Sequence, residues 1–447
     1  MNEYHNALIL GYGRSGQAAE RLLRSEGCST TVVAKEQTDD AALAELLREP
    51  SFDLCIVSPG FSVEHLWVRA IRDAGIPLLS ELELGWSRHR GKTVAVTGSN
   101  GKSTAVKWIC ESLCAAGLQA EIGGNYGVPA CEVVIKHPDL EWLVLEVSSF
   151  QLETVDLFQP DIAVVLNVLP NHLDRHGTME TYWQTKARIF GQSPRSDAVC
   201  MVPHDWRDRF RTVSGGGAWV TFGASDAADY SFHEGRIIFK GSPVVDLSGT
   251  QFDNPVLGSC TGAAVTAVAA AVGFDFEVVE RVAHQFIALP HRMQVLGVID
   301  EVKYVNDSKA TNLSALAAAV QGCRFPVHLI AGGLAKETDF TFVKDILVER
   351  AKKIYLVGRA SQSMYSAWNQ ICDCAECGTL EAAFQEARNQ AKPGEVVLLS
   401  PGCASFDQFR SFEERGDLFA DLFRRAGGAE GSTFRDSVGF GHSKKGV

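Results

Sequence analysis

The strongest constraint on the fold of this chain is a glycine-flanked turn that follows an apolar run. Residues 93–96 read TVAV and lead directly into TGSNGKST at residues 97–104. A strand that ends in such a turn and continues as a helix points backbone N–H groups and a helix N-terminus at one place, where an anion is stabilised. Gly98 and Gly101 stand closer together than the glycines of the general phosphate-loop pattern, so this is a variant loop.

The turn predicts a site for a nucleotide triphosphate on an α/β sheet. Lys102 is expected to meet the terminal phosphates as a point charge, and the Ser103 hydroxyl to bind the accompanying Mg²⁺. The alternative is a glycine turn that merely starts a helix. The residues expected to hold the nucleotide here are Gly98, Ser99, Asn100, Gly101, Lys102, Ser103 and Thr104.

Length and charge limit what the loop can belong to. The 447 residues exceed one hydrophobic core, and about 150 residues per domain suggests three domains. A net charge of −12 argues against a nucleic-acid partner or an anionic membrane surface. Residues 1–5 are polar, and no apolar run is expected to approach the roughly 18 residues of a membrane span. We therefore expect a cytoplasmic protein.

The cysteines are scattered, which is typical of reduced thiols in a reducing compartment. There are twelve, and the one cluster, at positions 372, 374 and 377, lacks a fourth cysteine or a nearby histidine. Zinc binding at that cluster stays open as the lesser alternative.

The first α/β block has a dinucleotide-type pattern. A strand at 7–10 is followed by GYGRSG at 11–16, a helix and a strand at 31–33, and a further strand at 54–57 ends in Ser-Pro-Gly at 58–60. Ala34 and Lys35 occupy the position where an acidic residue usually holds a ribose. The glycine pattern therefore leaves two interpretations, a bound nucleotide or a tight strand–helix junction.

In the second block two more strands deliver polar side chains to the sheet edge that carries the phosphate loop. The strand at 143–145 ends at Glu146, and the strand at 162–166 leads to His172. At that edge a second metal ion could bridge phosphate and substrate oxygens, although a structural role for His172 alone stays open. Lys186 lies in a segment of helical spacing, where a lysine is usually solvated.

The third block repeats strand–loop units, with strands at 327–330, 354–357 and 396–399, and predicts a doubly wound parallel sheet. The expected fold is thus α/β in three domains: a Rossmann-like N-terminal domain, a central P-loop domain with a parallel sheet plus a smaller β-sheet, and a Rossmann-like C-terminal domain. The expected boundaries are 1–90, 91–290 and 291–425, followed by a disordered tail at 426–447.

The motifs TGSNGKST, LEVSSFQLE, NHLDRH, TKARIF, LPHR, NDSKATN and CASFDQF occur in an order that resembles the Mur ligases. GGNYG, EVSSFQLE and CASFDQF together are most similar to the members that add D-glutamate. The resemblance implies ATP-dependent amide synthesis in peptidoglycan precursor formation. In it, the alanyl carboxylate of UDP-N-acetylmuramoyl-L-alanine attacks the γ-phosphate, and the amine of D-glutamate attacks the resulting acyl phosphate. It also implies a monomer.

The resemblance assigns roles to particular residues. Ser103 and Glu146 are expected to hold one Mg²⁺, His172 a second, and Lys186 to be carbamylated by CO₂ into a further metal ligand, so that Lys102, Glu146, His172 and Lys186 form the catalytic set. The expected contacts of the UDP-substrate are Arg14, Ser15, Gly60, Asn125 and His172. Those of ATP from the third domain are Arg292 and Asp307, and those of glutamate are Lys309, Thr311, Lys336, Ser405 and Phe412. Closure of the third domain is expected to assemble the site.

The chain departs from the family pattern at one nucleotide-binding stretch. Residues 258–264, GSCTGAA, have no amide side chain where the family reads adenine with a His-Asn pair and a following Asn. Two other functions stay open: a related ligase that adds L-glutamate or extends another acid such as a folate, and a noncatalytic nucleotide-binding relative.

Overall fold

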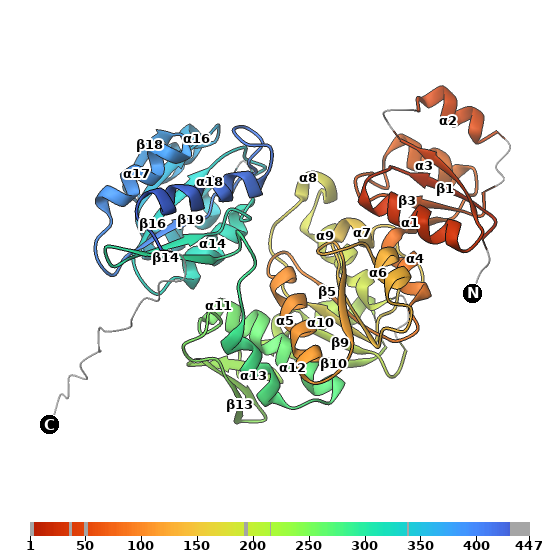
Figure 1. The fold of residues 1–447 in the computed structure, drawn as a ribbon, viewed down its shortest axis with the longest axis horizontal. Coiled ribbons are helices and arrows are strands. Elements are labelled where there is room, and N and C mark those ends of the chain that lie inside the picture. The colour runs from red at the N-terminus through yellow and green to blue at the C-terminus, as the bar shows by residue number, and fades with distance from the viewer. Residues whose placement is uncertain are drawn as a thin grey trace. The chain divides into compact units, whose positions relative to one another are not determined.

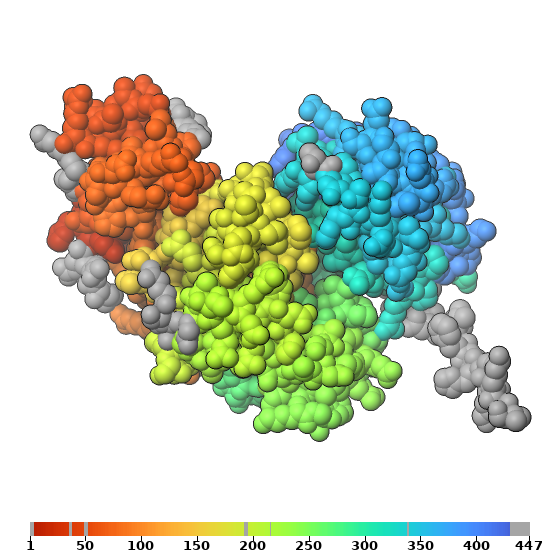
Figure 2. Space-filling model, turned by 180° about the vertical axis from the view of Figure 1, so that it is seen from behind, coloured from red at the N-terminus to blue at the C-terminus, as the bar shows by residue number. Residues whose placement is uncertain are grey.

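The chain forms two compact units, Met1–Phe286 and Ile287–Val447 (Figure 1). The computed structural model describes residues 4–34, 38–48, 52–191, 195–214, 216–337 and 339–429. Lys35 and most of the expected tail, residues 430–447, lie outside the described residues. Figure 2 shows the surface of the first unit in red to green and that of the second in teal to blue.

The first sheet of the first unit is four-stranded and parallel, in the order β2-β1-β3-β4. Its elements are β1 (Asn6–Leu10), α1 (Arg14–Ser25), β2 (Ser29–Val33), α2 (Asp40–Leu46), β3 (Leu54–Val57), α3 (Leu66–Asp73), β4 (Leu78–Ser80) and α4 (Glu81–Arg88). The expected strands at 7–10, 31–33 and 54–57 are confirmed. Ser87 and Arg88 are the last residues of α4, so this helix reaches almost to the expected domain boundary at residue 90.

The glycines of the first turn are needed for close packing. Gly11 has φ +88°, and a Cβ at Gly16 would lie 2.1 Å from the carbonyl oxygen of Gly11. The α1 helix therefore starts against the end of β1 with no room for a side chain. By contrast, nothing lies within 4 Å of a Cβ built on Gly13. Two of the three glycines thus make a tight strand–helix junction, whichever ligand the turn holds.

The second sheet of the first unit has nine strands, in the order β13-β12-β11-β10-β9-β8-β5-β7-β6. The strands are β5 (Lys92–Thr97), β6 (Ala120–Gly124), β7 (Trp142–Glu146), β8 (Ile162–Val165), β9 (Val199–Pro203), β10 (Ala218–Gly223), β11 (Tyr230–His233), β12 (Arg236–Phe239) and β13 (Ser242–Asp246). The pairs from β6 to β11 are parallel and the last two are antiparallel. The expected smaller sheet is therefore continuous with the parallel one.

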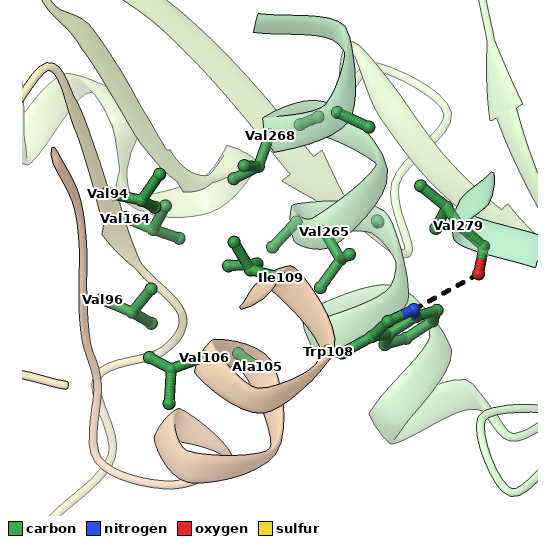
Figure 3. Packing of buried hydrophobic residues seen from close by; sticks show 14 of the residues in the cluster. Val94, Val96, Ala105, Val106, Trp108, Ile109, Val164, Val265, Val268 and Val279 are labelled. Atoms are coloured by element: carbon green, nitrogen blue, oxygen red, sulfur yellow. Dashed lines mark hydrogen bonds between the residues drawn. The ribbon is translucent and has the colours of Figure 1, made fainter. Parts of the chain in front are cut away.

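The helices of this part connect the strands and supply the core. They are α5 (Lys102–Ala115), α6 (Ala130–Lys136), α7 (Ser149–Leu152), α8 (Leu173–His176), α9 (Met179–Ala187), η1 (Arg188–Phe190), η2 (His204–Trp206), α10 (Arg207–Val213), α11 (Pro255–Leu257), η3 (Gly258–Gly262), α12 (Ala263–Val272) and α13 (Phe276–Gln285). Figure 3 shows α5 between the strands and α12, with Ile109 toward Val164 and Val265. The buried Trp108 donates from Nε1 to the Val279 carbonyl at 3.3 Å. The helix that starts at the phosphate loop is therefore held on both sides.

One stretch among the described residues, Pro255–Val272, is long and apolar enough to cross a membrane, with a mean hydropathy of 1.6. The expectation that no apolar run reaches that length is therefore wrong. In the structure 56% of the stretch is buried, and its Val265 and Val268 pack toward α5 (Figure 3). Such burial is that of a core helix.

The second unit contains one six-stranded sheet, in the order β14-β15-β19-β16-β17-β18. Its elements are β14 (Gln294–Ile299), β15 (Val302–Asn306), α14 (Leu313–Gly322), β16 (Val327–Gly332), η4 (Thr341–Val343), α15 (Lys344–Arg350), β17 (Ala351–Val357), α16 (Ser361–Trp368), β18 (Cys374–Gly378), α17 (Leu380–Gln390), β19 (Val396–Leu399) and α18 (Phe412–Arg425). Every pair is parallel except the β14–β15 hairpin at one edge. The predicted doubly wound sheet is thus confirmed.

All twelve cysteines are free, and no metal-binding group that includes Cys372, Cys374 or Cys377 occurs among the described residues.

The two sheets of the first unit are joined through α4, which carries a buried carboxyl group. Glu81 is 2% exposed and accepts a hydrogen bond from Cys131 N at 2.7 Å through Oε1, while its Oε2 has no partner in the described structure. Burial raises the pKa of Glu81 to about 7. The folded chain therefore holds this proton more tightly than the unfolded chain does.

We expect Glu81→Gln to gain stability relative to wild type as the pH rises. Because the pKa of Glu81 is higher in the folded chain than in the unfolded chain, ionisation of this group lowers the free energy of unfolding of wild type. This loss begins at about pH 5, near the pKa of the unfolded chain, and is complete near pH 8. At 1.36 kcal/mol per pKa unit, the variant should gain on the order of 3 kcal/mol over that interval, measured by urea unfolding at both pH values. Glu83→Gln is the matched control. Burial raises the pKa of Glu83 too, but both of its oxygens accept backbone bonds, from Asp156 N and Leu157 N, so this variant should be less stable than wild type at both pH values. A pH-independent difference for Glu81→Gln would contradict the interpretation.

Candidate active site

The phosphate loop is shaped by two glycines and held by an asparagine from the next strand. Gly98 has φ +155° and Gly101 has φ +84°, and Gly101 caps α5. Asn167, which follows β8, accepts from Ser99 N and Asn100 N, both at 3.0 Å, and donates from Nδ2 to Asn100 O at 3.1 Å. The N–H and C=O groups of a turn lack the partners that a neighbouring strand would supply, and the Asn167 side chain bonds them instead. No local sequence pattern signals this role of Asn167, because the bonds join segments 67 and 68 residues apart.

Two lysines converge on one carbonyl of this loop. Lys102 Nζ donates to Gly98 O at 2.8 Å and to Ser99 O at 3.1 Å, and Lys186 Nζ donates to the same Gly98 O at 3.0 Å. Lys186 is 1% exposed, so it is not a solvated helix lysine. Burial, and then the charge of Lys102, hold the pKa of Lys186 well below its usual range. Both effects favour the neutral amine.

A carboxylate and a hydroxyl meet beside the start of α5. Glu146, at the end of β7, accepts a hydrogen bond from the Ser103 hydroxyl and another from Asn125 Nδ2 at 2.6 Å. Ser103 and Glu146 are each 2% exposed. Hydroxyl and carboxylate oxygens suit Mg²⁺, and a buried carboxylate beside a phosphate loop fits that ion. The structure therefore brings together Ser103, Glu146 and Asn125, the residues that we expected to bind metal and substrate.

His172 lies on the connection between β8 and α8, in an unusual backbone conformation. Its φ is +55° and ψ is +31°, and its ring meets Phe150 edge-on at 4.8 Å between centroids. Phe150 belongs to α7, directly after the strand that carries Glu146. Across the described residues no three side chains of the His, Cys, Asp and Glu types form a metal-binding group. Any metal site here must therefore draw on mixed ligands such as Ser103.

The residues expected to contact the UDP-substrate in the first sheet lie at the carboxyl ends of β1 and β3. Arg14 donates to Gly127 O at 3.0 Å, which links the first sheet to the glycine-rich loop that carries Asn125. The two turns of the first sheet are joined by the Ser58 hydroxyl, which donates to Gly11 O at 2.9 Å. Arg14 and Gly60 are exposed and Ser15 is half-buried. These groups line one edge of a parallel sheet, where ligands of such sheets bind.

The turn that departs from the family pattern lies against the phosphate loop. Residues Gly258–Gly262 form a π-helical turn, and the Cys260 thiol donates to Leu166 O at 3.3 Å and accepts from Asn167 Nδ2 at 3.2 Å. Burial raises the pKa of Cys260 to about 11, so it stays a thiol. The Ser259 hydroxyl donates to Pro255 O. Ser259 and Cys260 thus make intramolecular bonds in place of base-reading amides.

In the second unit two expected glutamate contacts, Lys309 and Phe412, meet directly. Lys309 Nζ lies 3.9 Å from the centroid of the Phe412 ring, a cation–π distance. Ser405 is buried and Thr311 half-buried. Lys336 lines a separate open cavity of about 610 Å³ together with Arg359 and other residues.

The expected ATP contact Asp307 is buried beside Arg292, and its carboxylate is already hydrogen-bonded. It accepts from Met293 N at 3.0 Å and from the Ser400 hydroxyl at 2.9 Å. Burial raises the pKa of Asp307 to about 7, while the charges of Arg292 and Arg415 partly oppose that rise. The carboxylate is thus fixed by this unit's own groups before any nucleotide arrives.

Comparison with known proteins matches both units to one family. Residues 96–272 match the Mur ligase middle domain, and residues 291–403 match the Mur ligase glutamate ligase domain. The chain belongs to the Mur ligase family. It is 35% identical to the UDP-N-acetylmuramoylalanine–D-glutamate ligase of Acidobacterium capsulatum, over 93% of this chain and 95% of that one. The enzyme of the same name from Pelotomaculum thermopropionicum is also 35% identical, over 93% and 96%.

Solved Mur ligase structures share the fold. The MurF ligase of Thermotoga maritima, in complex with ADP, aligns with a TM-score of 0.60 at 18% identity, over 94% of this chain and 95% of that one. The UDP-N-acetylmuramate-alanine ligase MurC of the same organism gives 0.58 at 13% identity, over 95% and 100%. The predicted α/β fold is confirmed.

Proposed function

We propose that this Mur ligase joins D-glutamate to UDP-N-acetylmuramoyl-L-alanine in peptidoglycan precursor synthesis, in the cytoplasm and as a monomer. The observation that carries the proposal is the match over nearly the whole chain to ligases of that name. Supporting it, Lys102 and Lys186 share a carbonyl of the phosphate loop, and Ser103 and Glu146 meet beside its helix; Lys186, Ser103 and Glu146 are buried and Lys102 is half-buried. We keep the domain division 1–90, 91–290 and 291–425 as part of the proposal.

The chemical problem is the attack of one anion on another. A carboxylate that approaches the γ-phosphate of ATP meets like charge, and the loop N–H groups and Lys102 offset it as charge spreads over the transferring group. Mg²⁺ held by Ser103 and Glu146, with His172 at a second ion, would neutralise further phosphate charge. The products of the first step are an acyl phosphate and ADP. The amine of D-glutamate then attacks the acyl carbon, and phosphate leaves with one oxygen of the original carboxylate.

Lys186 is proposed to act as a carbamate. Its amine is kept neutral by burial and by Lys102, and a neutral amine reacts with CO₂ by forming an N–C bond and releasing a proton. The product is a carboxylate-like group, which suits Mg²⁺ as an ammonium would not. Its negative charge would also attract the ammonium group of Lys102, which donates to the same loop carbonyl.

The remaining contacts are proposed residue by residue. Glutamate would be bound by Lys309, Thr311, Lys336, Ser405 and Phe412, since two lysines suit a dicarboxylate. The nucleotide would also contact Arg292 and Asp307, and the UDP-substrate Arg14, Ser15, Gly60, Asn125 and His172.

We expect phosphate release from ATP to require both UDP-N-acetylmuramoyl-L-alanine and D-glutamate. The measurement is a coupled phosphate assay on the purified chain with D-glutamate, L-glutamate or no amino acid. Faster release with L-glutamate would favour the L-glutamate-adding alternative. No release under any condition would favour a noncatalytic nucleotide-binding protein.

A further inference from the structure

Arg175 of α8 makes two bonds to one carboxylate and stacks on an aromatic ring. Its Nε and a terminal nitrogen donate to the two oxygens of Glu153 at 2.9 and 2.6 Å, in the bidentate geometry of a strong ion pair. The guanidinium carbon lies 4.2 Å from the centroid of the Phe150 ring. The side chains of Arg175 and Glu153 are 13% and 9% exposed. The guanidinium is therefore fixed in orientation and largely shielded from water.

A second edge of the same guanidinium, which shares one terminal nitrogen with the first, holds a loop of the first sheet. Its terminal nitrogens donate to Pro59 O at 2.7 Å and to Phe61 O at 2.8 Å. These carbonyls belong to the residues on either side of Gly60, so the backbone is constrained both before and after that glycine. A Cβ built on Gly60 would meet nothing within 4 Å, so this side of the loop faces open space. Arg175 thus supports the loop while leaving it accessible to a ligand.

Phe150 links Arg175 to the acyl-transfer site. The ring that stacks on the guanidinium also contacts the His172 ring edge-on at 4.8 Å. One side chain therefore joins the loop at residues 59–61, the end of β7 through α7, and the segment that carries His172. All three lie in the first compact unit.

We propose that Arg175 is a positioning residue that sets the loop at residues 59–61 in register with the phosphate loop and so determines how the UDP-substrate is held. The inference rests on the proposed function for its substrate. Arg175 acts through the backbone carbonyls of Pro59 and Phe61 and needs no contact with the reacting atoms.

The test compares Arg175→Ala and Arg175→Lys with Arg188→Ala. Arg188 is the matched control because it also donates to backbone carbonyls, those of Glu153 and Val155, on the segment that carries the partner of Arg175. Removing Arg175 should raise the KM for UDP-N-acetylmuramoyl-L-alanine about tenfold to a hundredfold, the effect of losing charged hydrogen bonds. The KM values for ATP and D-glutamate should stay near wild type. Arg175→Lys should resemble Arg175→Ala, since an ammonium cannot span a carboxylate and two carbonyls.

Arg188→Ala should lower the melting temperature without a selective change in any KM. If the Arg175 variants lose stability and all kinetic constants change together, as for the control, the positioning role is overturned. Arg175→Lys keeps the buried positive charge, so it replaces Arg175→Ala in these measurements if the alanine variant does not fold. Millimolar guanidinium should partly restore the KM of Arg175→Ala and not that of Arg188→Ala, and a lack of restoration counts against the inference.

Direct binding separates this inference from the proposed function. Isothermal titration of UDP-N-acetylmuramoyl-L-alanine, without ATP or glutamate, should show the same tenfold or greater weakening, about that of the KM change. If the wild-type protein binds this ligand but catalyses no reaction, the proposed function fails. The inference is then still tested by comparing the affinities of wild type and Arg175→Ala for the ligand. If wild type turns over and Arg175→Ala binds as tightly as wild type, the inference is overturned and the proposed function stands.

Discussion

Lys186→Ala is expected to lower kcat by about a thousandfold or more while the protein stays folded. The variant removes the amine that would carry the carbamate. Lys186 donates to a loop carbonyl and is wholly buried, so its loss removes a proposed metal ligand directly beside the phosphate loop. The measurement is steady-state phosphate release, with circular dichroism to confirm the fold.

The role of CO₂ can be separated from the role of the lysine itself. Wild type in CO₂-depleted buffer should lose activity reversibly, and ¹³C-labelled bicarbonate should give a carbamate signal that is absent from Lys186→Ala. Lys107→Ala is the matched control, because Lys107 lies on α5 and pairs with Glu111 outside the loop. Full activity of Lys186→Ala, or indifference of wild type to CO₂ depletion, would refute the carbamate.

Lys102→Met is expected to reduce kcat about a hundredfold to a thousandfold with little change in the KM for the UDP-substrate. The side chain keeps its length and packing but loses the charge proposed to face the transferring phosphoryl group. Without that charge, the repulsion between carboxylate and γ-phosphate is less well offset.

Single-turnover kinetics would locate the loss caused by Lys102→Met. The formation of ADP should slow as much as the overall reaction does, because the charge is needed in the first step. Unchanged ADP formation with a slower second step would assign Lys102 a different role. Lys107→Met should behave as wild type in both measurements.

The local parts of the site could be predicted from the sequence, because each is a short motif at a strand end. The phosphate loop, Glu146 at the end of β7 and the doubly wound sheet of the second unit follow from glycine spacing and apolar runs. The order of motifs also predicted the family. These motifs involve residues that are close in sequence, so they can be recognised without knowing how the chain packs.

The long-range parts could not be predicted in the same way. Lys186 and Gly98 are 88 residues apart, so no local pattern shows that Lys186 and Lys102 share one carbonyl. The support of the loop by Asn167 and the two-sided role of Arg175 likewise depend on which strands become neighbours in the sheet. The continuity of the nine-stranded sheet was missed because the β9–β10–β11 pairing is invisible to strand periodicity.

Isotope transfer tests the central claim most directly, which is that the site activates an acid by forming an acyl phosphate. UDP-N-acetylmuramoyl-L-alanine would carry ¹⁸O in its alanyl carboxylate and react with ATP and D-glutamate, and the released phosphate would be analysed by mass spectrometry. We expect one ¹⁸O atom from the carboxylate in each phosphate, because the carboxylate oxygen that attacks phosphorus leaves with it. Phosphate that is free of label while the amide product accumulates would contradict the account.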